Sequence, residues 1–148
     1  MVMIPEPVKK QWQSLRESPI NYGPGFWDLW NEQWQPYFID LQTLVKKNMG
    51  FEMPASDSDL LYKLSKKLTF FIDLLRANKN KFTLNATARD LIAHHIGNGL
   101  YLIYLIGNLT ENTIEPIPPE NVHKIAIAVN DMELFWKDLR AIEKLKKF

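Results

Sequence analysis

The chain has 148 residues, enough for one domain to bury a hydrophobic core without disulfides or structural metals. Apolar residues make up 46% and charged residues 24%, which is typical of a folded globular domain and excludes a disordered chain. The net charge of +1 creates no global field that favours nucleic acid or an anionic membrane, and the absence of cysteine excludes disulfide scaffolds, thiolate metal sites and a cysteine nucleophile.

The first 25 residues predict an irregular N-terminal segment, because prolines interrupt them and Gly23-Pro24-Gly25 ends them as a turn. They contain no apolar core of signal-peptide length. The longest apolar run, LYLIYLI at 100–106, is too short to span a bilayer. We therefore expect a soluble, cytoplasmic protein that makes no membrane contact.

Two long helices are predicted next. From Phe26, apolar residues recur at steps of three and four, which indicates an amphipathic helix. Pro36 interrupts this stripe and predicts a kink, or two abutting helices, near Gln35. The second helix follows serine and aspartate capping candidates at 56–59. Its predicted apolar face consists of Leu60, Leu61, Leu64, Leu68, Phe71, Leu74 and Leu75.

A third helix is predicted from about Asn85 to Leu109, and a polar, proline-rich connection leads from it to a final helix that ends in KLKKF at 144–148. The run 125–129 also suits a strand, but a single strand has nothing to pair with, so helix is preferred. We predict one all-α domain over 1–148, with a four- to five-helix up-and-down bundle over 26–147. The predicted stripe of the final helix includes Val122, Ile125, Ile127, Val129, Met132, Phe135, Leu139, Ile142 and Leu145.

His94 and His95 are adjacent in the third helix but point about 100° apart. His95 falls within the broad apolar arc of this helix, which also contains Leu102, so we expect a core or interface histidine with one hydrogen bond. His94 falls on the opposite, polar side, together with Asp90, Asn98 and Tyr101. The Asp90 carboxylate, one turn earlier, is placed to orient the imidazole as in a catalytic base with its orienting group. An exposed histidine in a weak surface pair has the same spacing.

Arg89 lies five positions before His94, so the two side chains diverge by roughly 140° on a straight helix. They converge only on a substrate between them or across a symmetric partner. Arg89 also lies near the helix start, where a cation opposes the helix dipole. The alternative is an arginine that extends along the surface.

The segment RDLIAH at 89–94 resembles the signature of the HEPN superfamily (higher eukaryotes and prokaryotes nucleotide-binding), an arginine followed after four to six positions by a histidine. The layout of residues 57–147 is also similar, with a long apolar helix before the motif and an amphipathic helix at the end. The resemblance implies an all-α bundle that dimerises so that two motifs line one cleft. It also implies a metal-independent endoribonuclease of a defence or toxin–antitoxin system, although other members are binding modules without activity.

The same resemblance implies that His94 acts as general acid or base at the RNA 2′-OH, that Arg89 steadies the phosphate charge, and that Asp90 orients or polarises the pair. RNA, a second copy of the chain, and an antitoxin or nucleotidyltransferase are the implied partners, with no cofactor and no metal. The stretch after the motif, 95–109, is more apolar than a groove for RNA, and few lysines or arginines lie near it. A dimer interface would bury this stretch together with His95.

Two alternatives remain open. In the first, the chain is a helical interaction or structural module in which Arg89, Asp90 and His94 only pack or pair. In the second, it is a metal-binding bundle resembling DinB-type proteins that uses His94, His95 and His123, although adjacent residues rarely bind one ion. A further tryptophan set has helical spacing that favours a core over a ligand-stacking surface: Trp12, Trp27, Trp30 and Trp34.

Overall fold

The computed structural model describes the backbone of residues 26–77, 86–111 and 115–146, and the side chains of residues 27–77, 92–111 and 115–140. The predicted irregular segment 1–25 lies outside these residues. All regular elements within the described ranges are helices, which confirms the predicted all-α bundle. They are α2 (Phe26–Gln33), α3 (Gln35–Lys47), α4 (Ala55–Ala77), α5 (Ala86–Gly107) and α6 (Pro119–Lys146).

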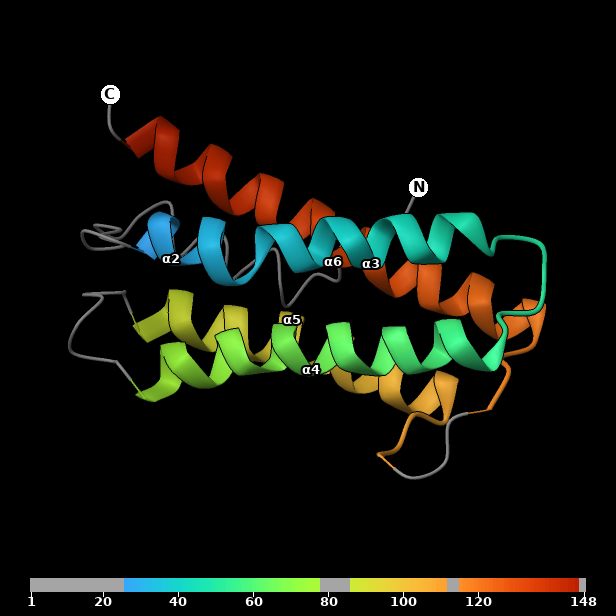
Figure 1. Cartoon of the computed structure of the whole chain (residues 1–148). Coiled ribbons are helices and arrows are strands. Elements are labelled where there is room, and N and C mark those ends of the chain that lie inside the picture. The colour runs from blue at the N-terminus through green and yellow to red at the C-terminus, as the bar shows by residue number, and fades with distance from the viewer. Residues whose placement is uncertain (1–25, 78–85, 112–114, 147–148) are drawn as a thin grey trace.

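The helices form a ring of neighbours. In Figure 1, α2 and α3 lie nearly in line, α4 and α5 run beside each other, and α6 crosses behind α3. Contacts join α3 to α4, α4 to α5, α5 to α6, and α6 back to α3. Consecutive long helices run in opposite directions, as expected for an up-and-down bundle. None of the described helices is both long and apolar enough to cross a membrane.

The break between α2 and α3 lies where Pro36 predicts it. Proline has no backbone N–H to donate to the carbonyl four residues earlier, so the helical hydrogen bonding is interrupted. Pro36 occupies the first turn of α3, and Trp34 joins the two helices with φ −117° and ψ −59°. The backbone continues almost straight, because Trp34 N–H donates to the Trp30 carbonyl (3.0 Å) and Phe38 N–H donates to the Trp34 carbonyl (2.9 Å).

Aromatic rings fill one end of the core. Trp34 is fully buried, and its ring lies 5.3 Å from Phe38, 5.6 Å from Phe71 and 5.5 Å from Trp136. Trp30 is also buried, and Trp27 is half-buried beside it. The predicted core role is therefore confirmed for Trp30 and Trp34, whereas Trp12 lies outside the described residues.

Three residues of the predicted apolar faces are exposed instead: Leu60 (44%), Leu102 (45%) and Ile127 (43%). Leu60 is next to the fully buried Leu61, and adjacent helical residues point about 100° apart, so both cannot face the core. Ile127 follows Ile125 by two positions, or about 200°, and therefore points outward when Ile125 is buried. These faces are narrower than predicted.

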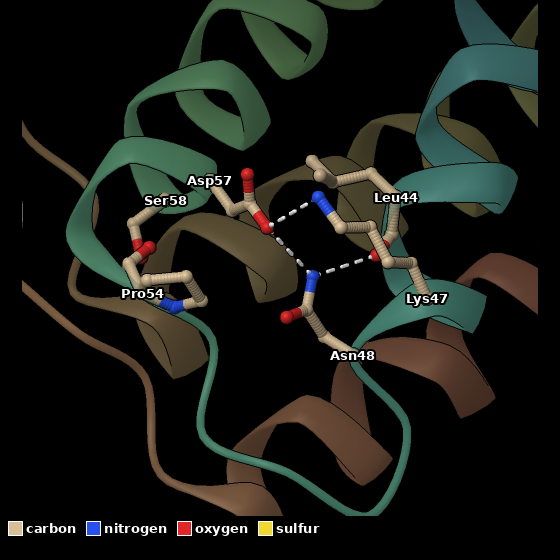
Figure 2. A network of polar contacts seen from close by, with 6 residues as sticks. All are labelled: Leu44, Lys47, Asn48, Pro54, Asp57 and Ser58. Atoms are coloured by element: carbon tan, nitrogen blue, oxygen red, sulfur yellow. Dashed lines mark hydrogen bonds and ion pairs between the residues drawn. The ribbon is translucent and has the colours of Figure 1, made fainter.

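Polar contacts connect the end of α3 to the start of α4 (Figure 2). The Asn48 side-chain amide donates to the Leu44 carbonyl (3.0 Å) and to the Asp57 carboxylate (3.1 Å), and Lys47 lies 3.3 Å from the same carboxylate. Asn48 is 5% exposed, so its two bonds satisfy an amide that has left water. They fix the direction in which α4 leaves the turn.

A short backbone pairing joins the α3–α4 connection to the α5–α6 connection. Met53 N–H donates to the Ile117 carbonyl (2.8 Å), and Ile117 N–H donates to the Met53 carbonyl (2.9 Å). Both side chains are buried. The proline-rich connection that the sequence marks as polar thus places one apolar residue in the core and closes this end of the bundle.

Candidate functional site

The two adjacent histidines have different environments, as predicted. His94 is exposed, whereas His95 is half-buried and its ring stacks on Phe135, with 4.8 Å between centroids and 15° between planes. This contact confirms the predicted packing role of His95, which lies between α5 and α6 of the same chain. Arg89 and Asp90 belong to α5, but their side chains lie outside the described residues, so their implied roles remain predictions.

His94 lines a groove between α4 and α5, with a volume of about 290 Å³. Each of the two helices contributes three polar residues to the groove, at the spacing i, i+4, i+7 that places side chains on one face of a helix. Buried Ile72 and Leu100 supply apolar surface between them. The polar set consists of Thr69, Asp73 and Arg76 from α4 and His94, Asn98 and Tyr101 from α5.

The groove therefore brings a cation, a carboxylate and an imidazole together from two helices. Arg76 lies in the last turn of α4, where the helix dipole favours a positive charge. No described side chain forms an ion pair with Arg76, so its planar set of donors remains available for an anion. Asp73 and His94 supply a negative group and the side chain best suited to proton transfer at neutral pH.

Tyr104 also lines the groove and adds a neutral hydroxyl. Burial raises the pKa of Tyr104, and a hydrogen bond with the Thr69 side chain partly opposes that increase. The phenol consequently stays protonated at neutral pH and is able to donate as well as accept. The ring is held edge-on by Tyr62, at 6.0 Å between centroids.

Gly97 opens the α5 wall of the groove. A Cβ atom built at this glycine meets nothing within 4 Å, so packing inside the chain does not require a glycine there. The absence of a side chain leaves the backbone of α5 accessible between His94 and Tyr101. The sequence offers no specific signal for Gly97, Asp73 or Arg76, because their grouping with His94 depends on which helix packs beside α5.

A second polar pair, His95 and Asp131, lies between α5 and α6. Burial lowers the pKa of His95, while a hydrogen bond to the Asp131 backbone and the charge of Asp131 partly oppose this decrease. Burial raises the pKa of Asp131, and the charge of His95 opposes that increase. The Asp131 Oδ1 atom is buried and has no hydrogen-bond partner among the described residues. This pair belongs to the α5–α6 interface and does not line the groove.

No group of three or more histidine, aspartate or glutamate side chains gathers as a metal site within the described ranges. His123 is exposed near the start of α6 and is not a groove residue. The three histidines therefore give no support to a DinB-like metal site.

No protein-family model matches the chain, and neither does any curated protein or solved structure. The likeness to the HEPN superfamily therefore rests on residues 89–94 and on the order of the helices.

Proposed function

We propose that the chain is a metal-independent RNA endonuclease that acts in the α4–α5 groove. The observation that carries this proposal is the grouping of exposed His94 with Arg76 and Asp73 across two helices. RNA contains its own nucleophile, the 2′-hydroxyl, so cleavage needs only proton transfer and stabilisation of phosphate charge. His94 and Arg76 have the chemistry for these two tasks.

In the proposed step, the neutral His94 imidazole accepts the 2′-hydroxyl proton while the 2′ oxygen forms a bond to the adjacent phosphorus. The bond from phosphorus to the 5′ oxygen breaks, and the imidazolium returns its proton to that oxygen. The products are a 2′,3′-cyclic phosphate and a 5′-hydroxyl, and His94 is again neutral. Arg76 stabilises the negative charge on the non-bridging phosphate oxygens.

The HEPN resemblance assigns the phosphate contact to Arg89 and an orienting role to Asp90. In our proposal Arg76 supplies positive charge from the neighbouring helix, and Arg89 adds a second cation from its own chain or from a second copy. The proposal therefore requires His94 and Arg76, whereas the contribution of Arg89 is tested separately by Arg89→Gln.

The test is cleavage of a single-stranded RNA in the presence of EDTA. Loss of general acid–base catalysis lowers a rate about 100-fold or more, and removal of one charge-stabilising group has an effect of about the same size. We expect such losses for His94→Ala and Arg76→Gln and no loss for His123→Ala, which removes another exposed histidine. DNA of the same sequence should stay intact. Equal rates for wild type and His94→Ala would rule out the proposed catalytic role.

A second candidate function, a non-catalytic interaction module, is supported by the outer face of α5. Tyr101 (63% exposed), Leu102 (45%) and Leu105 (59%) form an apolar surface that lacks cover among the described residues. If this surface holds a second copy, sedimentation should show a dimer that Leu105→Glu dissociates. Phe70→Glu, at a residue of similar exposure on α4, is the control. A wild-type chain that remains monomeric contradicts this candidate.

A further inference from the structure

A second cavity lies between α3 and α6, on the opposite side of the helix ring from the α4–α5 groove. Its volume is about 260 Å³, slightly below the range of sites for drug-sized ligands. We call it the α3–α6 cavity. None of its lining residues belongs to the groove that contains His94.

Aromatic rings form the apolar part of this cavity. Trp30 and Trp136 line it with their centroids 5.7 Å apart, and Phe38 lies beside them. All three residues are buried, so their rings are held by the core and do not depend on a ligand for their positions. A flat apolar group would find preformed surface here.

Among the described residues that line the cavity, the only carboxylate already has partners. Glu133 accepts a hydrogen bond from the Gln42 side-chain amide (3.0 Å) and lies 3.2 Å from the Lys137 ammonium group. Its negative charge is thus balanced by Lys137. A cationic ligand would have to displace these contacts.

The donors in the cavity are not matched in this way. Arg140 lies over the rings of Trp27 (4.3 Å) and Trp30 (4.8 Å), and no described side chain forms an ion pair with it. These ring contacts satisfy no N–H donor, so the five donors of the Arg140 guanidinium have no anionic partner among the described residues. The indole N–H groups of Trp30 and Trp136 are also buried, with no hydrogen-bond partner among the described residues.

From this surplus of donors beside an aromatic wall we infer that the α3–α6 cavity binds a small aromatic carboxylate. The carboxylate pairs with the guanidinium donors of Arg140, and the ring of the ligand packs on Trp30 and Trp136. A guanidinium can donate two parallel N–H bonds to the two coplanar oxygens of a carboxylate, which is why we infer a carboxylate ligand.

Phenylacetate is a suitable probe, with neutral phenylacetamide as its matched analogue. The indole N–H signals of the five tryptophans are observed in a ¹H–¹⁵N spectrum of the full chain and assigned with Trp→Phe variants. Titration with phenylacetate should shift the signals of Trp30 and Trp136. Phenylacetamide should bind at least tenfold more weakly, because it lacks the charge that pairs with Arg140. Phenyl phosphate, titrated in parallel, reports whether a tetrahedral anion is accepted equally well.

Arg140→Gln should weaken phenylacetate binding at least tenfold, whereas Lys124→Gln, which removes an exposed cation of α6 outside the cavity, should leave it unchanged. Arg140→Lys keeps the charge without the planar fork and should fall between wild type and Arg140→Gln. Absence of shifts at millimolar phenylacetate overturns the inference. Equal affinity for phenylacetate and phenylacetamide, or tighter binding of phenyl phosphate, overturns it too. The titrations with phenylacetate, phenylacetamide and phenyl phosphate use the wild-type chain, so they remain decisive even if Arg140→Gln unfolds.

Discussion

Two glycines of α5, only two residues apart, should respond in opposite directions to the same substitution. A glycine in a helix interior is about 0.8–1 kcal/mol less favourable than alanine. At Gly97 a Cβ atom meets nothing within 4 Å, so Gly97→Ala gains this difference without a steric cost. We expect the free energy of unfolding to rise by about 1 kcal/mol, and the melting temperature by about 3 °C for a chain of this size.

At Gly99 a Cβ atom lies 3.1 Å from both Cγ and Sδ of Met132. Met132 is only 1% exposed, so it has little room in which to move. Overpacking a core typically costs about 1–3 kcal/mol, which exceeds the gain in helix propensity. Gly99→Ala should therefore lower the free energy of unfolding by about 1 kcal/mol, although the chemical change is the same as at Gly97.

Urea unfolding of wild type, both single variants, Met132→Ala and the double variant Gly99→Ala/Met132→Ala provides the assay. Truncation of Met132 removes the crowded atoms, so in that background Gly99→Ala should become stabilising by about 1 kcal/mol. The reasoning is refuted if Gly99→Ala stabilises the wild-type chain as much as Gly97→Ala does. It is also refuted if Gly99→Ala has the same effect with and without the Met132 side chain.

Two further predictions concern polar groups. Asn48→Ala removes two hydrogen bonds made by a buried side chain, so it should lower the free energy of unfolding, measured in urea, by about 2 kcal/mol. Lys47→Met removes the ion pair of a largely exposed side chain and should change the free energy of unfolding by less than about 0.5 kcal/mol. Burial lowers the pKa of His95, so the unfolded chain binds the proton more readily and stability should fall as the pH drops through about 6.5. Asp131 acts in the opposite sense nearer its ordinary pKa of 3.8. His95→Phe should therefore make the loss of stability between pH 7 and 5 shallower than in wild type, with His123→Ala as the control. A loss of stability in His95→Phe as steep as in wild type or in His123→Ala would contradict this assignment.

The helices could be predicted from the sequence because their signals are local. Steps of three and four between apolar residues identify each helix, and the missing N–H of Pro36 interrupts the long helix before Trp34 without the help of distant contacts. The opposite environments of His94 and His95 follow from the 100° rotation between adjacent residues. Such features depend only on backbone geometry within one helix.

The groove could not be predicted in the same way. Asp73 and Arg76 face His94 because α4 packs on α5 at one particular rotation, which is set by the whole core. The pairing of Met53 with Ile117 likewise joins two connections that are far apart in the sequence. The sequence correctly predicts which side of α5 His94 occupies, but it contains no separate signal for the residues that complete the site.

The groove and the apolar surface of α5 share only Tyr101 among the described residues, so self-association and catalysis would not exclude each other. Along its outer face the residues change from polar to apolar: His94 and Asn98 lie toward the start of the helix, and Tyr101 and Leu105 lie toward its end. A second copy that packs on Leu105 would border the groove without covering His94, because these residues are separated by about three helical turns. Tyr101 belongs to both surfaces, since it lines the groove and is 63% exposed. Self-association at the apolar end of α5 would thus add a wall to the groove and would be compatible with catalysis at its polar end.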